Sequence, residues 1–368
     1  MIEIGGKNIG AGAPCFIVAE LGTSHLGSAE KARKLADAAA EAGADCVKLQ
    51  LVYADEILHP LSGEVDLPTG KIELYRQFKS LELDISFYRD FKEYAERRGL
   101  VFLCSVFGLR SARELKSIGA QAIKIASPEL NHYPLLREVG SYGLPLLLSS
   151  GVSTLGDIEK SLSIAAKEVI LLHCITAYPA PEDEYNVRVL GTLRAAFGVE
   201  TGISDHSLDP ILVPVLSVLN GACVVEKHFT LDRTGAGLDD PIALEPDAFA
   251  SMVSRVREAE KNPSSIRAFL ESKYGRERIS RVEGSGRKEL AASEKANYIR
   301  TNRSIHALDE IPRSAFITGD MVAILRTEKK LRPGIGPEFL ASVIGARAQR
   351  RIPPGEGIEW EDVIEKNG

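Results

Sequence analysis

Gly43-Ala-Asp-Cys-Val-Lys48-Leu-Gln50 is the stretch that decides the fold, because its pattern recurs along the chain. A glycine comes first, as is typical of a helix end that needs a left-handed backbone. A short apolar run follows, as is typical of a parallel strand buried on both faces. The same pattern begins at four other glycines: Gly99, Gly119, Gly143 and Gly221. The polar endings of such strands are where an α/β barrel carries its chemistry.

Three further apolar runs complete a series of eight predicted strands, at residues 16–20, 44–50, 100–105, 122–127, 145–150, 169–174, 201–206 and 222–229. Helical patterns lie between them, including 29–42 after the N-cap candidate Ser28, 87–98, 111–118, and 154–166 after Ser153. Eight alternating units predict a (β/α)8 TIM barrel. A doubly wound open sheet is the alternative, although no Gly-x-Gly-x-x-Gly turn follows the first strand.

The rest of the chain predicts two further parts. We expect the catalytic barrel at residues 1–270, with a last helix ending near Lys261, and a linker at 271–299. Residues 300–368 contain β-like runs at 304–307, 321–325 and 342–344, broken by proline and glycine, which predict a small β-rich domain. So small a domain needs to dock against the barrel or a second subunit. The long connection 56–80 is expected to form a lid or substrate wall.

Bulk properties argue against several classes of protein. The formal net charge of −6 over 368 residues is unfavourable for binding nucleic acid. No apolar run reaches the roughly 18 residues of a membrane span, and the start lacks the features of a signal peptide. The five cysteines show no pairing pattern and are expected to be reduced. We therefore expect a cytoplasmic protein without a nucleic-acid or membrane partner.

Lysines and serines at the predicted strand ends indicate a site for an anion. The lysines are Lys48 and Lys124, and the hydroxyls are those of Ser105, Ser127, Ser149, Ser150 and Ser204. A buried lysine must be paired or change its pKa. Ammonium, hydroxyl and backbone N–H groups together form a set that binds phosphate or carboxylate. The alternative is that each lysine forms a salt bridge with a barrel carboxylate, such as Glu226 or Asp45.

Two histidines at neighbouring strand ends indicate a metal site. His206 and His228 end the seventh and eighth predicted strands, and Glu20 ends the first, beside the eighth. Imidazole with carboxylate suits Mn²⁺, Fe²⁺, Co²⁺ or Zn²⁺. The alternative is that both histidines are hydrogen-bonded barrel residues. His173 falls inside its strand and is expected to be a packing residue.

These residues resemble the sialic acid synthase family, which condenses phosphoenolpyruvate with an N-acetylated sugar to make nonulosonic acids. The stretches that match include Ala19–His25, Val47–Gln50, Ile123–Glu129, Leu148–Gly151, Ser204–His206 and Glu226–Thr230. The tail, with Arg303–Ile305 and Leu331–Gly334, resembles that family's antifreeze-like SAF domain, which has a β-clip fold. The resemblance spans nearly the whole chain.

The resemblance implies a role for each matching residue. The positions that hold phosphoenolpyruvate are Lys48, Ser105, Lys124, Ser127, Ser149 and Ser204. The metal ligands are His206 and His228, with Mn²⁺ the usual ion and Mg²⁺ or Co²⁺ as alternatives. The sugar-side positions are Glu20, Gln50, Tyr178 and Asp239. Arg332 matches an arginine that the tail inserts into the barrel mouth of the partner subunit in a domain-swapped homodimer.

The implied reaction joins phosphoenolpyruvate to an N-acetylmannosamine-like aldehyde and releases phosphate, with Glu20, Lys48, Lys124 and His228 as the catalytic groups. Three positions depart from the family pattern: Ser105 replaces threonine, Pro128 replaces glycine, and Thr176 replaces an asparagine that touches the sugar. The acceptor therefore stays open between sialic, legionaminic, pseudaminic and spore-coat sugar precursors. Two other readings are a Schiff-base aldolase that uses Lys124 and a carbohydrate-binding protein without catalysis.

Overall fold

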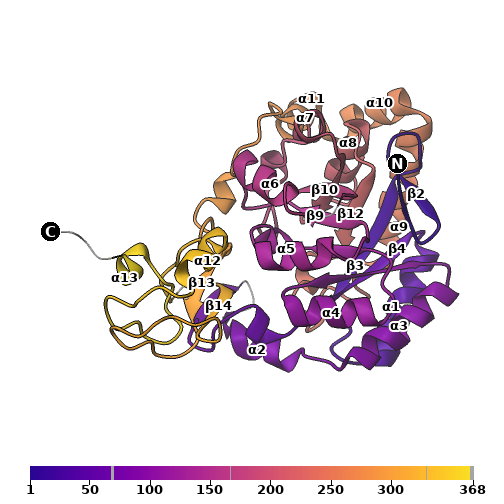
Figure 1. Cartoon of the computed structure of the whole chain (residues 1–368). Coiled ribbons are helices and arrows are strands. Elements are labelled where there is room, and N and C mark those ends of the chain that lie inside the picture. The colour runs from indigo at the N-terminus through magenta and orange to yellow at the C-terminus, as the bar shows by residue number, and fades with distance from the viewer. Residues whose placement is uncertain (68–69, 166, 329, 365–368) are drawn as a thin grey trace.

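A computed structural model describes residues 1–67, 70–165, 167–328 and 330–364. Within these ranges eight parallel strands form a closed barrel beside a smaller C-terminal domain (Figure 1). The barrel strands, in order, are β3 (Phe16–Gly22), β4 (Cys46–Leu51), β7 (Val101–Val106), β8 (Ile123–Ile125), β9 (Leu146–Ser149), β10 (Val169–Cys174), β11 (Glu200–Asp205) and β12 (Val224–His228). β12 pairs with β3 and closes the barrel. The predicted fold is confirmed, and the open sheet is excluded.

Helices surround the barrel: α1 (Ala29–Glu41), α3 (Ile85–Arg97), α4 (Leu109–Ser117), α5 (Tyr133–Gly140), α6 (Leu155–Leu162), α7 (Val189–Phe197), α8 (Leu212–Leu219) and α9 (Pro246–Lys261). Ser28 caps α1 as predicted, since its Oγ accepts the Lys31 N–H at 3.2 Å. The prediction for α6 is wrong at its start, because Thr154 is the N-cap. Residue 166, the predicted end of that helix, lies outside the described ranges, and α6 ends at Leu162.

The recurring glycines adopt the backbone that their pattern predicts. The φ angles of Gly43, Gly99, Gly119, Gly143 and Gly221 lie between 69° and 88°. Only glycine adopts this left-handed region without steric cost, so each of these positions ends one helix and starts the turn into the next strand. All five cysteines are buried and free, as expected.

The barrel interior is filled with apolar side chains at the end opposite the polar strand endings. Val18, Leu103 and Leu172 belong to this cluster. It is closed from below by an N-terminal hairpin of β1 (Ile2–Ile4) and β2 (Lys7–Ile9), which contributes three isoleucines. The barrel interior therefore consists of a dry apolar core at the amino ends of the strands and a polar pocket at their carboxyl ends. No helix in the described ranges is long and apolar enough to cross a membrane.

The C-terminal domain has its own core, built on a pair of antiparallel strands. These are β13 (Arg303–Ala307) and β14 (Val322–Arg326), followed by the short helices α12 (Leu340–Val343) and α13 (Trp360–Val363). Ile305, Ile317 and Ile352 are fully buried in it. The predicted β-like run at 342–344 is wrong, because α12 turns the fully buried Val343 into the same core.

The segment expected to be a linker is ordered against the barrel. α10 (Pro263–Tyr274) reaches into it, α11 (Arg276–Glu283) follows, and a 3-10 turn covers Ala292–Glu294. Its charged composition suggested solvent, but Glu283 forms ion pairs with Arg188 and Arg267, while Glu294 is completely buried. The limits predicted for the three parts, at residues 270 and 299, stay predictions.

The C-terminal domain docks on its own barrel through buried charges. Arg303 is 2% exposed, and its guanidinium donates to Glu129 Oε1 at 2.8 Å and to the Phe107 carbonyl at 3.0 Å. The Arg326 guanidinium donates to the same Glu129 oxygen at 2.6 Å, and the Arg326 backbone N–H donates to the Ile57 carbonyl. Both arginines therefore tie the domain to loops at the carboxyl end of the barrel.

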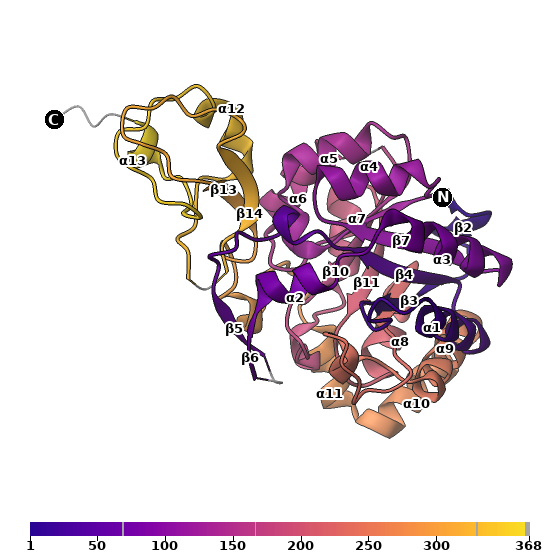
Figure 2. The same ribbon diagram turned by 90° about the horizontal axis from the view of Figure 1, so that it is seen from below.

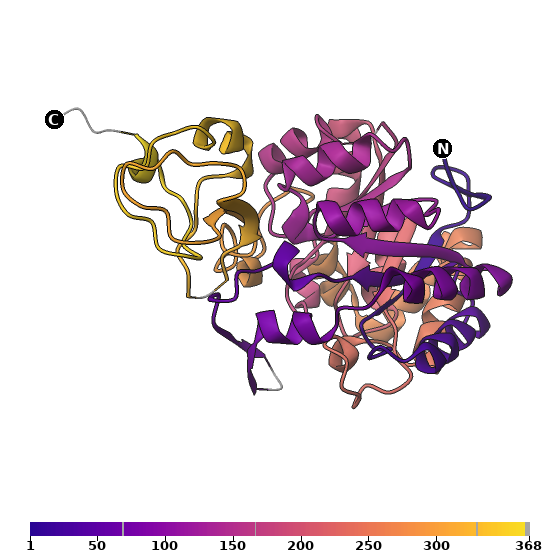
Figure 3. The same cartoon turned by 60° about the horizontal axis from the view of Figure 1, so that its bottom comes forward.

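The connection 56–80 lies on the side of the barrel that faces the C-terminal domain (Figures 2 and 3). It forms a hairpin of β5 (Glu64–Leu67) and β6 (Gly70–Glu73), followed by α2 (Leu74–Ser80); residues 68–69 lie outside the described ranges. Leu74 and Phe78 of α2 line the polar pocket. This agrees with the expected substrate wall.

Strand packing predicts a contrast between two glycines. A Cβ at Gly202, in β11, would lie 2.7 Å from the carbonyl oxygen of Val224 and 2.8 Å from Leu172 Cδ2, whereas one at Gly191, in α7, would meet nothing within 4 Å. Gly202→Ala should lower the free energy of unfolding by about 1–3 kcal/mol. Gly191→Ala should leave it unchanged or raise it by up to about 1 kcal/mol. Urea unfolding measures both, and equal stability of the two variants would contradict the packing.

Candidate active site

A cavity of about 460 Å³ opens at the carboxyl end of the barrel strands. It brings together all but one of the predicted site residues: Glu20, Lys48, Gln50, Ser105, Lys124, Ser127, Ser149, Tyr178, Ser204, His206, His228 and Asp239. Arg332 does not line it. Ser150, the other strand-end hydroxyl, donates instead to the Leu172 carbonyl at 3.0 Å.

Strand register places these residues at one level. Glu20 on β3 is paired with Lys48 on β4 and with His228 on β12. Ser105 on β7 is paired with Lys124 on β8. Because neighbouring parallel strands carry their side chains in step, the register converts separate strand ends into one ring of polar groups.

The two lysines share a carboxylate. Lys48 Nζ lies 2.6 Å from Glu20 Oε2 and donates to Ser105 Oγ at 3.1 Å. Lys124 Nζ donates to Ser149 Oγ at 2.7 Å. Glu226 lies between them, with its carboxylate oxygens 3.8 Å from Lys48 Nζ and 3.9 Å from Lys124 Nζ. The salt-bridge alternative is thus present for both lysines, through Glu226, and the same ammonium groups also line the cavity.

Asp45, the other carboxylate considered, is not their partner. It binds Lys7 at 2.6 Å and Arg257 at 2.7 Å.

Burial sets the protonation of this charge cluster. Burial lowers the pKa of Lys124, and Glu226 only partly opposes that shift. Burial alone would also lower the pKa of Lys48, but the negative charges of Glu20 and Glu226 outweigh burial, so the net effect is a raised pKa. Burial raises the pKa of Glu226, yet Lys124 and Lys48 bring it down to about 2. Glu226 is therefore ionised at neutral pH and holds positive charge at the floor of the cavity.

The imidazoles of His206 and His228 lie across the cavity from the lysines. The centroids of these two rings are 5.4 Å apart, and the Tyr178 ring stacks on the His206 ring at 4.3 Å. His206 Nδ1 lies 2.8 Å from the Ile175 carbonyl, which accepts its proton and leaves Nε2 as the second nitrogen. Burial lowers the pKa of His228 to about 3, so this ring is neutral. Burial alone would lower the pKa of His206, but the nearby Cys174 sulfur outweighs it and raises the pKa to about 9.

This donor set fits a divalent metal with most of its positions open. A backbone carbonyl that fixes one nitrogen of a histidine is the usual outer support of a metal ligand. Loss of the His206 proton would accompany binding of a cation. Among the described residues no group of three or more His, Cys, Asp or Glu side chains could hold an ion by itself. Substrate and water would have to complete the coordination.

The outer part of the cavity combines polar groups with an apolar wall. Gln50 donates to Glu20 Oε1 at 2.8 Å, and Asp239 Oδ2 lies 3.7 Å from His228 Nδ1. The wall is formed by Leu74, Phe78, Ala177, Leu238, Pro241 and Ile242. Thr176, one of the departures noted in the sequence, also lines the cavity. A polyhydroxylated ligand with an apolar substituent suits such a surface.

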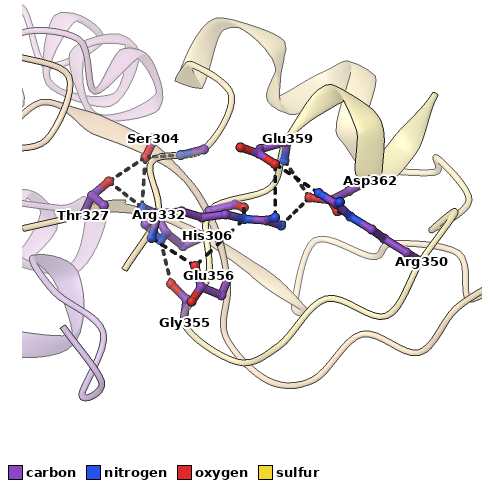
Figure 4. A network of polar contacts seen from close by, with 11 residues as sticks. Ser304, His306, Thr327, Arg332, Arg350, Gly355, Glu356, Glu359 and Asp362 are labelled. Carbon is purple, nitrogen blue, oxygen red and sulfur yellow. Dashed lines mark hydrogen bonds and ion pairs between the residues drawn. The ribbon is translucent and has the colours of Figure 1, made fainter. Parts of the chain in front are cut away.

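Arg332 is held within its own domain (Figure 4). Its guanidinium binds Asp362 at 2.6 Å and Glu359 at 3.1 Å, and it donates to the Gly357 carbonyl at 2.8 Å. The insertion of this arginine into the mouth of a partner barrel stays a prediction, as does the homodimer.

Sequence reasoning missed several groups of the cavity. Glu226 was considered only as a lysine partner, although it is central to the charge cluster. The C-terminal part of the chain contributes Asn297, Thr301, Arg326 and Glu328. No local pattern marks these four, because only the docking of the domain brings them to the barrel mouth.

A barrel with a polar pocket at the carboxyl ends of its strands is the architecture of an enzyme that acts on small molecules. The chain belongs to the NeuB family, whose profile matches residues 35–267, and the SAF domain profile matches residues 302–364. The resemblance found in the sequence is thereby confirmed.

Three relatives show how far the similarity extends. The spore coat polysaccharide biosynthesis protein SpsE of Bacillus subtilis is 33% identical over 99% of this chain and 98% of its own, and its crystal structure superposes with a TM-score of 0.84 over 100% and 99% of the two chains. The N,N'-diacetyllegionaminic acid synthase of Legionella pneumophila is 30% identical, over 97% of each. The N-acetylneuraminic acid synthetase of Leptospira borgpetersenii, solved with citrate, is 32% identical over 80% and 94%, with a TM-score of 0.65.

The partly buried carboxyl of Asp239 predicts a pH-dependent cost to stability. Burial raises its pKa from 3.8 to about 6, so the folded protein disfavours the ionised form and loses stability as the pH rises from about 4 to 6. Asp239→Asn should therefore be more stable than wild type at pH 7.5 by about 1–2 kcal/mol, since one pKa unit corresponds to about 1.4 kcal/mol and part of the side chain is exposed.

Urea unfolding at pH 7.5 and at pH 4.0 measures this difference. The gain should nearly vanish at the lower pH, where the carboxyl is mostly protonated in the folded protein. A gain of equal size at both values would contradict burial as its cause.

Proposed function

We propose that this protein condenses phosphoenolpyruvate with the open-chain aldehyde of an N-acylated amino hexose, giving a nonulosonic acid and phosphate. One observation carries the proposal: two buried lysines with hydroxyl partners face two imidazoles across a single cavity, in a chain of the NeuB family. A phosphorylated enol acid and an aldehyde sugar are substrates that suit those two sides.

The lysine side would hold phosphoenolpyruvate. Lys48 and Lys124, with the hydroxyls of Ser105 and Ser149 beside them, offer charge-assisted hydrogen bonds to its phosphate and carboxylate. The groups are fixed by burial before the ligand arrives, so little reorganisation is needed. The citrate bound to the Leptospira relative, itself a small carboxylate anion, is consistent with an anion site in this family.

The imidazole side would hold a divalent metal through His206 and His228. When bound, such an ion polarises the aldehyde oxygen as a Lewis acid. Tyr178 stacks on one face of the His206 ring, and its hydroxyl would hydrogen-bond the sugar. Gln50 and Asp239 lie on the same side and would orient its hydroxyls.

The bonds change as follows. The C3 carbon of phosphoenolpyruvate attacks the aldehyde carbon, whose oxygen takes up a proton, and positive charge develops at C2. Water adds to C2 and gives up a proton, and loss of phosphate leaves the keto acid. Glu20, held by Lys48 and Gln50, would orient that water and accept its proton. Lys48 and Lys124 would stabilise the departing phosphate.

The acceptor is an N-acylated sugar. Its further substituents decide whether the product is a sialic, a legionaminic, a pseudaminic or a spore-coat sugar. The apolar wall from α2 and residues 238–242 favours an acceptor with an apolar group at its far end. The relative from Legionella, by name a diacetyllegionaminic acid synthase, supports including diacetamido sugars among the candidates.

Phosphate release tests the reaction. Wild-type protein should release phosphate only when phosphoenolpyruvate, an acceptor sugar and Mn²⁺ are all present. Lys124→Met should reduce kcat/KM by about a thousandfold or more, because it removes a preorganised charge worth several kcal/mol. Lys160→Met is the matched control, since that lysine is 60% exposed on α6, and it should retain full activity.

His228→Ala should abolish release and weaken Mn²⁺ binding in calorimetry. Undiminished activity of this variant, or of wild type after chelation, would contradict the metal site. A panel of N-acetylmannosamine, its 6-phosphate and a 2,4-diacetamido hexose as acceptors would select the branch.

A Schiff-base aldolase is the second candidate, because burial lowers the pKa of Lys124 and so favours a neutral, nucleophilic amine. Borohydride reduction in the presence of pyruvate would then trap an adduct on Lys124. The proposed condensation predicts no adduct, and mass spectrometry of the peptide containing Lys124 decides between the two.

A further inference from the structure

We propose that Glu294, in the segment between the barrel and the C-terminal domain, is a positioning residue for the anion side of the active site. It lies outside the cavity, touches none of the groups assigned above to phosphoenolpyruvate, and acts through two backbone N–H groups. The inference rests on the proposed function for what the positioned site binds.

Glu294 reaches the loops that follow two barrel strands. Its Oε1 atom accepts the N–H of Val152, after β9, at 2.8 Å and the N–H of Thr176, after β10, at 2.7 Å. Its other oxygen accepts the N–H of Ala291 at 3.3 Å. The residue is 0% exposed. One carboxylate oxygen therefore bridges two loops that have no strand pairing at this level.

The loop after β9 is held in a conformation that its sequence does not favour. Val152 has a φ of 43°, a left-handed value that is a true outlier for a β-branched residue. Such a backbone persists only where its surroundings hold it. Glu294 holds its N–H, and Asn302 Nδ2 donates to its carbonyl at 3.1 Å. Lys288 Nζ donates to the neighbouring Ser150 carbonyl at 3.1 Å.

The strained loop adjoins the anion site. The N–H of Gly151 donates to Ser127 Oγ at 2.9 Å, and Ser149, the Lys124 partner, ends the preceding strand. The space is tight, since a Cβ on Gly151 would lie 2.9 Å from Ser127 Oγ and 3.1 Å from Glu294 Oε1. A shift of Val152 would therefore disturb the Ser127 hydroxyl, which Gly151 binds, and the Ser149 hydroxyl, which Lys124 binds.

The second loop leads to the metal side. Thr176, whose N–H Glu294 accepts, follows Ile175, whose carbonyl fixes the His206 ring. Loss of the carboxylate would leave two buried N–H groups without acceptors, which costs free energy and lets the loops relax. The expected consequence is weaker binding of phosphoenolpyruvate, with the charges of the cavity still in place.

Two variants of equal length separate positioning from simple filling of space. Glu294→Gln keeps an oxygen that can accept both N–H groups, while Glu294→Met fills the volume without an acceptor. Glu184→Met is the control. Glu184 lies in the barrel turn Glu182–Glu184 and also accepts from the segment, through the N–H and Oγ of Ser293, the residue before Glu294. Calorimetry with phosphoenolpyruvate and amide hydrogen exchange at Val152 and Thr176 are measured on all three full-length proteins and on wild type.

The inference predicts about tenfold weaker binding and faster exchange at both amides for Glu294→Met. It predicts values within about threefold of wild type for Glu294→Gln and for the control. Equal affinities of the Met and Gln variants, or unchanged exchange in Glu294→Met, would overturn it, as would the same loss in Glu184→Met. Wild-type protein that does not bind phosphoenolpyruvate would instead contradict the proposed function, and the inference with it.

Discussion

The buried contact of Glu226 with Lys48 and Lys124 is the constraint on which the rest of the site depends. Two ammonium groups in a dry barrel are costly unless a negative charge lies near them. Glu226 supplies that charge at 3.8 and 3.9 Å, and Glu20 adds a closed ion pair with Lys48 at 2.6 Å. Glu226 stays too far from either ammonium group to occupy its hydrogen bonds.

The barrel makes this arrangement possible by dividing its interior. The hairpin β1–β2 and the apolar cluster close the lower half, so the polar strand endings share one small cavity above. Strand register then sets Glu20 beside both Lys48 and His228, which joins the anion side to the imidazole side. The segment 271–299 and the C-terminal domain complete the mouth through Asn297, Thr301, Arg326 and Glu328.

The sequence could predict what depends on local pattern. The glycine, the apolar run and the polar ending are each short-range signals, so the eight strands and most of the site residues at their ends could be placed from them, whereas Asp239 followed only from the family resemblance. Contacts across long stretches of chain were beyond such reasoning: Glu294 lies in a charged stretch that resembles a linker, and its burial depends on loops over 100 residues away. Arg332 differs for another reason, since its predicted place concerns a second subunit.

A crystal structure of the protein with phosphoenolpyruvate and Mn²⁺ tests the central claim most directly. The account predicts the phosphate and carboxylate of the ligand within hydrogen-bond distance of Lys48 Nζ and Lys124 Nζ, and the metal on His206 and His228. Lysines that stay bound only to Glu20, Ser105, Ser149 and Glu226, with the ligand seated elsewhere, would contradict it.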